Sequence, residues 1–441
     1  MSPPAADNAL SRFTYNVLGV ERREYVAVAW SFLYFFCLLA AYYMLRSVRE
    51  TMAIVSGVEN IPWLYTGTFA IMLLATPVFG WIASRFPRRS FVPWVYWFFI
   101  VNVLAFFAAF TALGDQLDRV WVARTFFVWL SVFNLFVVSV FWSFMVDIYS
   151  TEQSRRLFGI ISAGGSTGAF LGPLFTSAVV VPIGFENLLP ISALLLGIAV
   201  WCVHRLRRWS LAQPAADGSA QKPESRPLGG SALAGMKLVF TTPYLGAIAT
   251  GQMAVNVLGV VIYVYMADLV SRNFPVVDEQ TRVFALVDAC SNALSFIGQL
   301  LIVKQAVQRL GMAGTLAIYP IVSLLGFALL AANPVFMVIA AFQVVRRGIG
   351  YGLTKPATDM LYSVVSREAK YKAKNFIETA VWRASDLAGV WTVRMLTGLG
   401  LAGVSLACLP LAAAWGLLAL WIGREYRRRD RGPEEVAYGR A

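Results

Sequence analysis

Long apolar segments that could each cross a membrane as a helix recur along the whole sequence. A helix needs about 20 apolar residues to span the hydrocarbon core of a bilayer. We count twelve such segments, at residues 27–45, 61–83, 91–113, 120–145, 157–182, 187–203, 243–267, 282–303, 313–331, 334–354, 375–397 and 404–423. A β-barrel is excluded because these runs lack the alternation of lipid-facing and lumen-facing residues that barrel strands require. The sequence therefore predicts an all-α membrane protein with twelve transmembrane helices.

Composition agrees with this fold class and excludes several kinds of site. Of the 441 residues, 58% are hydrophobic and 14% are charged, which is too few charges for the surface of a soluble protein. The four cysteines lie in apolar segments at wide spacing, a pattern that indicates neither disulfides nor a metal site. His204 is the only histidine, which excludes a histidine-ligated metal. We therefore expect no metal and no cofactor.

Basic residues gather in alternate connections between the apolar segments. They include Arg85, Arg155, Lys304, Lys370 and the run that begins at Arg427. By the positive-inside bias, both termini should be cytoplasmic. Since these residues flank spans instead of covering one surface, the excess of 37 basic over 24 acidic residues does not indicate nucleic acid as a partner. We also expect no cleaved signal peptide, because the polar first 25 residues lack its short apolar core.

A polar stretch near the middle of the chain divides the apolar segments into two sets of six. The stretch from His204 to Lys237 is rich in Pro, Gly, Ser and Ala. We expect a six-helix bundle at 1–203, a cytoplasmic linker at 204–240, a second six-helix bundle at 241–426 and a cytoplasmic tail at 427–441. A shift of 216 residues places the segment from Ser150 over that from Ser366, a weak internal repeat. Two six-helix pseudo-repeats resemble the plan of the major facilitator superfamily, whose substrates bind at the midplane between the halves.

Two sequence motifs strengthen this resemblance. "GWIASRFPRR", Gly80 to Arg89, is similar to the facilitator signature G-x-x-x-D-R-x-G-R-R, with Ser84 at the acidic position. The resemblance implies a gating role for Gly80, Arg85 and Arg89; an ordinary basic loop is the alternative. "GIISAGGSTGAFLGPLF" fits an antiporter pattern of facilitator helix 5 at Gly159, Gly168, Gly172 and Pro173. Small residues on one helix face also allow close packing without any role in antiport.

Two further stretches resemble the nucleotide carriers of intracellular bacteria and plastids. "MLRSVRET" is similar to their helix 1 pattern L-R-x-x-K-D-T, with Arg46, Arg49, Glu50 and Thr51 in register. The segment from Lys355 to Gly389 is similar to their K-E-M-A-Y and K-G-K-A-A-x-D-V stretches. The matching residues are Asp359, Met360, Tyr362, Lys372, Lys374, Glu378 and Arg383, whereas Asp386 stands where a lysine is expected.

Charged residues inside the spans are the strongest candidates for a functional site. Such charges are costly in a bilayer unless they are paired or hydrated. Because guanidinium groups outnumber carboxylates here, we expect an anion to bind. The expected substrate-binding residues are Arg46, Arg49, Arg124, Asn256, Arg346, Arg347, Arg383, Trp382 and Tyr43. The facilitator plan places helices 1, 4, 7 and 10 around the cavity, and Arg346 is our first choice. The expected coupling residues are Glu50, Asp288, Glu378 and Asp386.

Several of these charges could instead satisfy one another. Arg46 and Glu50 are four residues apart, and Arg383 and Asp386 are three apart, so each pair can close on one helix face. The side chains of Arg46, Arg49 and Arg124 could also extend to the membrane interface. Asp288 could carry a proton, or it could form a salt bridge with an arginine of the other half of the sequence.

We therefore expect a secondary transporter of a bacterial inner membrane that moves an organic anion by alternating access, with nucleotide or phosphate-ester exchange as the leading substrate class. It should not be an enzyme, since no catalytic motif occurs; the lack of a G-x-x-x-x-G-K-S/T loop argues in particular against direct ATP hydrolysis. Its expected partners are a small anion and the lipid bilayer, with protons as a coupling ion to be tested. The alternatives are a proton-coupled exporter of drugs or siderophores and a non-transporting membrane enzyme or sensor.

Overall fold

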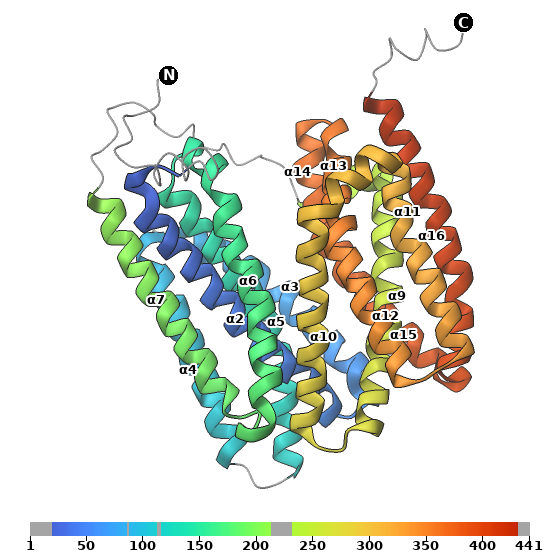
Figure 1. Ribbon diagram of the computed structural model, residues 1–441, viewed down its shortest axis with the longest axis horizontal. Helices are drawn as coiled ribbons and strands as arrows, with labels where there is room; N and C mark the ends of the chain where they lie inside the picture. The colour runs from blue at the N-terminus through green and yellow to red at the C-terminus, as the bar shows by residue number, and fades with distance from the viewer. Residues whose placement is uncertain (1–19, 86–87, 113–115, 213–231, 431–441) are drawn as a thin grey trace, which may run out of the picture. The chain divides into compact units, whose positions relative to one another are not determined.

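The computed structural model describes residues 20–85, 88–112, 116–212 and 232–430 (Figure 1). Every regular element in this part of the chain is a helix. The prediction of an all-α protein is therefore confirmed for the described residues.

Contacts within the chain define two compact units. The first unit comprises Met1–Ser56, Ala70–Gly218 and Pro275–Ala289, and the second comprises Gly57–Phe69, Ser219–Phe274 and Cys290–Ala441. Two helices, α3 and α10, contribute residues to both units. The boundaries expected from the sequence, at residues 203, 240 and 426, remain predictions.

The first unit is built around α2. Its elements are η1 (Arg22–Glu24), α2 (Tyr25–Val55), the part of α3 (Ile61–Arg85) from Ala70, α4 (Arg88–Ala112), α5 (Gln116–Ile148), α6 (Thr151–Ile183), α7 (Leu188–Ala212) and the start of α10 (Val277–Ile297). Helix α2 packs against α5, α6 and α7, and α4 packs against α5 and α7 (Figure 1). Aromatic rings fill the core between them, where the rings of Phe35 and Phe141 stack at 4.0 Å.

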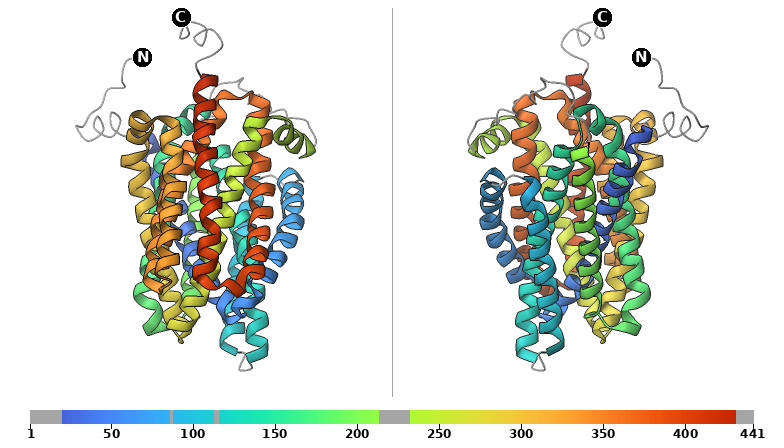
Figure 2. Two further views of the ribbon diagram at one scale, coloured as in Figure 1. Left: turned by 90° about the vertical axis from the view of Figure 1, so that its right-hand side faces the viewer. Right: turned by 90° about the vertical axis from the view of Figure 1, so that its left-hand side faces the viewer.

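The second unit contains the other helices. They are η2 (Val58–Asn60), α8 (Ala232–Thr241), α9 (Pro243–Asn273), the end of α10, η3 (Gly298–Ile302), α11 (Val303–Ala332), α12 (Phe336–Ile349), η4 (Gly350–Thr354), α13 (Lys355–Met360), η5 (Leu361–Val364), α14 (Arg367–Phe376), η6 (Ile377–Val381), α15 (Trp382–Leu396), η7 (Thr397–Leu399) and α16 (Gly400–Asp430). Helix α9 packs against α15 and α16, and α11 runs beside α16 (Figure 2).

The described residues contain nine segments that are long and apolar enough to cross a membrane. Two of them, Val277–Ala332 with 56 residues and Lys372–Asp430 with 59, are much longer than the roughly 20 residues that one crossing needs. Each contains a glycine with a left-handed backbone, Gly311 at φ 67° and Gly400 at φ 65°, where a helical run is interrupted. The count of twelve transmembrane helices therefore remains a prediction.

A row of glycines brings α6 against the backbone of α2. A Cβ atom built at Gly164, Gly168 or Gly172 would lie 2.5, 2.3 or 2.7 Å from a carbonyl oxygen of α2. Because the three are four residues apart, they form one stripe along α6. The interpretation that Gly159 belongs to this packing surface is wrong, since a Cβ there would meet nothing within 4 Å. Close packing therefore accounts for Gly168 and Gly172 of the sequence pattern, but not for Gly159.

We expect Gly168→Ala to lower the free energy of unfolding by about 1–3 kcal/mol, because the new methyl group would overlap the Phe36 carbonyl oxygen and push the two helices apart. Gly159→Ala is the matched control on the same helix. It should leave stability unchanged or raise it by up to about 1 kcal/mol, the gain in helix propensity. Thermal unfolding of both variants in detergent measures the difference; equal stability of the two would contradict the packing argument.

Candidate functional site

The second unit buries an arginine among neutral hydrogen-bond acceptors. Arg346 lies in the last turn of α12 and is only 8% exposed. Its Nη1 donates to the Tyr319 hydroxyl of α11 at 3.0 Å, and its Nη2 donates to Gln343 Oε1 at 3.3 Å. Gln343 lies one turn earlier on the same helix face. The guanidinium group is thus held in place by two uncharged side chains.

The positive charge of Arg346 is not balanced by a neighbouring carboxylate. Among the residues that the structure describes, none has a carboxylate oxygen within 4.0 Å of this guanidinium group. Its Nε is also buried without a hydrogen-bond partner in the described part of the chain. Burial of an unpaired charge is costly. A group in this state can bind an anion strongly, because the anion supplies the missing partner.

Helix α9 supplies the wall beside Arg346. A Cβ atom at Gly259 would lie 2.9 Å from Arg346 Nη1 and 3.1 Å from Nη2, so only glycine leaves room for the guanidinium group in this position. Three residues earlier on α9, the buried Asn256 donates to the backbone oxygen of Trp382 at 3.3 Å. The structure thus brings Arg346, Asn256 and Trp382, three of the expected substrate-binding residues, to neighbouring positions along one stretch of α9. We call Arg346, Tyr319, Gln343, Gly259 and Asn256 the Arg346 site.

Gly259→Ala should weaken anion binding about tenfold without changing stability, because the methyl group displaces the flexible end of Arg346 and removes one charge-assisted hydrogen bond. Gly251→Ala is the control on the same helix, since its Cβ would meet only ordinary contacts, the nearest at 3.7 Å. Equilibrium binding of a labelled anion to both purified variants measures the effect. Equal affinities would show that the position of the guanidinium group is unimportant.

Two of the other expected charges of the second unit, Arg383 and Asp386, pair with each other. Arg347 is buried beside Arg346 at 7% exposure. Arg383 and Asp386 form the expected pair on one face of α15, with Nη1 and Oδ2 at 3.9 Å. The possibility that these two satisfy one another is therefore confirmed.

Glu378 belongs to a four-residue ion-pair network. Lys355 Nζ donates to Glu378 Oε1 and, at 2.9 Å, to Asp359 Oδ1; Lys374 Nζ lies 2.8 Å from the same Asp359 oxygen. Burial would lower the pKa of Lys355, but the hydrogen bonds that it donates to both carboxylates raise it. Burial would raise the pKa of Asp359, but hydrogen bonds from the two lysines lower it. The network pairs two lysines with two carboxylates, so their charges balance.

In the first unit, the charges at the end of α2 form a second cluster. Arg46 Nε lies 3.6 Å from Glu50 Oε1 and 3.7 Å from Asp288 Oδ2, and Arg49 Nη2 donates to Glu50 Oε1 at 2.8 Å. The carboxylates are more deeply buried than the arginines, at 6% and 4% side-chain exposure. We call these four residues the Arg46 cluster. The salt-bridge alternative for Asp288, with an arginine of the other half of the sequence, is confirmed.

The first unit contains the remaining residues that were predicted for the site. The guanidinium carbon of Arg46 is 5.6 Å from the Tyr43 ring centre. Arg124 donates to the Ser56 backbone oxygen at 3.5 Å and lies over the ring of Trp121. Gly80 and Arg85 lie in α3 and Arg89 lies in α4, but the surroundings of these three residues are outside what the structure describes.

Three residues that contact the predicted site residues Arg346 and Glu378 were not predicted from the sequence. Gln343 stands three positions before Arg346, a spacing that indicates a contact on one helix face. Lys355 is the first residue of the stretch that resembles the nucleotide carriers, but the residues predicted there as candidates for the site all follow it. Tyr319 gave no signal, because a tyrosine inside an apolar segment most often packs or anchors the helix. In the described part of the chain, no three His, Cys, Asp or Glu side chains could together hold a metal ion.

Comparison with known proteins identifies the family. The family model of the Major Facilitator Superfamily matches residues 23–375, which is most of the chain. The chain belongs to this superfamily, whose members are membrane transporters.

Two curated relatives are carriers of adenine nucleotides. The chain is 21% identical over 435 residues to ADP,ATP carrier protein 2, chloroplastic, of Arabidopsis thaliana, covering 84% of this chain and 69% of the relative. It is 24% identical over 186 residues to ADP,ATP carrier protein 2 of Chlamydia pneumoniae, covering 35% of this chain and 34% of that carrier. The match thus spans about a third of the length of the Chlamydia protein. These similarities agree with the nucleotide-carrier motifs of α2 and of the region from Lys355.

Solved structures share the fold. A bacterial homologue of the iron transporter ferroportin in an inward-facing state has a TM-score of 0.64 at 12% identity, covering 91% of this chain and 99% of that one. The nucleoside transporter NupG has a TM-score of 0.59 at 16% identity, covering 91% and 98%. At these identities the likeness supports the fold alone.

Proposed function

We propose that this facilitator is a secondary transporter of an organic anion that works by alternating access in a bacterial inner membrane. In this proposal, the chain crosses the membrane twelve times with both termini in the cytoplasm. The preferred substrate class is a nucleotide or another phosphate ester, moved by exchange.

The observation that carries the proposal is the buried charge of Arg346. The Arg346 site offers a guanidinium group at 8% exposure, fixed by Tyr319 and Gln343 and lacking a carboxylate partner among the described residues. A phosphate or carboxylate can accept two parallel hydrogen bonds from such a group. An uncharged substrate would leave the positive charge unbalanced, so the site favours anions. The names of the two carrier relatives support a phosphate-bearing anion.

The ion pairs of the structure argue against a proton-coupled exporter. The expected coupling residues all have cationic partners: Arg46 lies near both Asp288 and Glu50, Lys355 contacts Glu378, and Arg383 pairs with Asp386. Two of the three glycines that gave the exporter its motif, Gly168 and Gly172, pack against the α2 backbone, which accounts for them without a role in antiport. Exchange of one anion for another requires no titrating carboxylate.

Transport by the purified protein in liposomes tests the proposal. We expect labelled nucleotide or phosphate ester to enter liposomes preloaded with the unlabelled compound when the pH is equal on both sides. Uptake that occurs only with a pH gradient would favour the proton-coupled exporter. Absence of uptake for every anion tried, with or without a gradient, would contradict the proposed function.

A further inference from the structure

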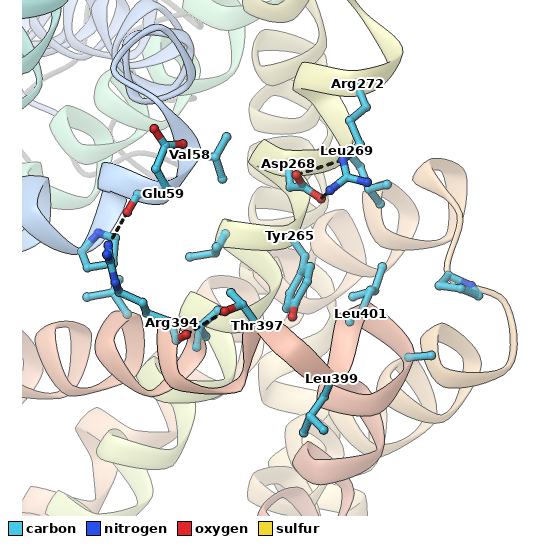
Figure 3. Close-up of a pocket in the computed structure, with 17 residues that line it drawn as sticks. Val58, Glu59, Tyr265, Asp268, Leu269, Arg272, Arg394, Thr397, Leu399 and Leu401 are labelled. Carbon is cyan, nitrogen blue, oxygen red and sulfur yellow. Dashed lines mark hydrogen bonds and ion pairs between the residues drawn. The ribbon is translucent and has the colours of Figure 1, made fainter.

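The second unit contains a cavity that is separate from the Arg346 site. It has a volume of about 810 Å³, within the range of small-molecule binding pockets (Figure 3). Its walls come from the turn before α3, the last part of α9, and the junction of α15 with α16. On α9 the cavity begins at Val264, whereas Arg346 lies against Gly259.

One pair of charges in the cavity is internally satisfied. Arg272 Nε lies 3.0 Å from Asp268 Oδ1, and Arg272 Nη2 lies 3.0 Å from Asp268 Oδ2. This two-point pairing uses both carboxylate oxygens and leaves no net charge. Arg272 and Asp268 therefore form a neutral part of the wall (Figure 3).

Two other charges in the cavity have no ionic partner among the described residues. Arg394 Nη1 donates to the backbone oxygen of Glu59 at 2.7 Å, but no described carboxylate forms an ion pair with it. The Glu59 side chain accepts a hydrogen bond from Asn60 Nδ2 at 3.1 Å and has no described cationic partner. Since the Glu59 carbonyl group accepts a hydrogen bond from Arg394, the positive group is held against the backbone of the residue that carries the negative group. Figure 3 shows the carboxylate turned away from the guanidinium group.

The rest of the lining is mainly apolar. Val264, Leu269, Val393 and Leu401 contribute aliphatic surface, and the ring of Tyr265 adds an aromatic wall. Tyr265 is 7% exposed, and its buried hydroxyl group has no hydrogen-bond partner in the described part of the chain. The cavity thus combines one cation and one anion without ionic partners among the described residues, and an apolar wall.

We infer that this cavity binds a zwitterion with an apolar body, whose acidic group pairs with Arg394 and whose ammonium group pairs with Glu59. A simple anion would be attracted by Arg394 but repelled by Glu59. A simple cation would be attracted by Glu59 but repelled by Arg394. A zwitterion satisfies both groups, and its apolar part covers the aliphatic wall. Phosphatidylethanolamine from the bilayer and a water-soluble hydrophobic peptide share this chemistry.

Binding to the purified full-length protein tests the inference with matched probes. Oleoyl lysophosphatidylethanolamine is zwitterionic, and oleoyl lysophosphatidate has the same chain and phosphate but no ammonium group. We expect Glu59→Gln to weaken binding of the first about tenfold, the loss of one charge-assisted contact, and to leave binding of the second unchanged or tighter. Arg394→Gln should weaken both. Arg207→Gln, an exposed arginine of α7, is the control.

The Glu59 variant keeps the inference testable even if Arg394→Gln folds poorly, because no described ion pair depends on the Glu59 carboxylate. If leucyl-leucine competes with the lysolipid, soluble zwitterions are ligands of the cavity. If the lysolipid binds and leucyl-leucine does not compete, the ligand comes from the bilayer. Both results support the inference. Unchanged binding of the zwitterion in both cavity variants, relative to the control, would overturn it. The inference does not depend on the proposed substrate, since Arg346 takes no part in this cavity.

Discussion

Arg346→Gln should lower the uptake of the transported anion about 10- to 150-fold, the equivalent of about 1.5–3 kcal/mol for hydrogen bonds to a charged group. Glutamine cannot supply the positive charge or the forked pair of donors. The same change should leave the thermal unfolding midpoint equal to or above that of the wild type, because it removes a buried charge that no described carboxylate balances. Lost transport with retained stability is the combination expected of a binding residue.

Two comparisons make this result specific. Arg346→Lys keeps the charge but loses the fork, so it should retain part of the uptake. Arg207→Gln removes an exposed arginine of α7 and should have no effect. If Arg346→Gln lowered stability and transport together, Arg346 would be a structural residue and the site assignment would be wrong.

The second large effect is expected in the Arg46 cluster. Arg46→Gln removes a cation that lies 3.6 Å from Glu50 and 3.7 Å from Asp288, two carboxylates with side-chain exposures of 6% and 4%. Removing one partner of a buried ion pair costs about 3–5 kcal/mol, because the other charge loses its compensation. Thermal unfolding should therefore show a strongly destabilised protein, in contrast to Arg346→Gln.

A second substitution distinguishes lost pairing from lost packing. Asp288→Asn added to Arg46→Gln should recover more than half of the lost stability, since it removes a carboxylate that has lost its cation. Arg428→Gln is the control, because Arg428 and Glu425 also lie 3.7 Å apart but Arg428 is 75% exposed. That change should cost no more than about 1 kcal/mol. Lack of recovery in the double variant would mean that Arg46 stabilises the unit by packing alone.

The helical fold and the superfamily could be predicted from sequence because they depend on local information. Apolar length determines where helices form, and short motifs such as the one around Arg46 indicate the family. Ion pairs within one helix were also accessible, since Arg46 with Glu50 and Arg383 with Asp386 follow from helical spacing.

Contacts between helices could not be predicted in the same way. The partner of Asp288 is Arg46, which is remote in sequence, and the hydroxyl that holds Arg346 comes from Tyr319 on another helix. Likewise, close packing requires a glycine at position 168 but not at position 159, because a Cβ atom would meet the α2 backbone at the first position and nothing within 4 Å at the second. Such differences depend on how the helices pack, which residue spacing along one helix does not specify.

The central claim is that Arg346 binds the negative charge of the substrate. The most direct test measures the affinities of wild-type protein and Arg346→Gln for two ligands. The first is the anion that exchanges fastest in liposomes, and the second is its uncharged form, made by removing the phosphate or amidating the acid. Wild-type protein should bind the anion about 10- to 150-fold more tightly than the neutral form, and Arg346→Gln should abolish this preference. An equal preference for the anion in both proteins would contradict the account.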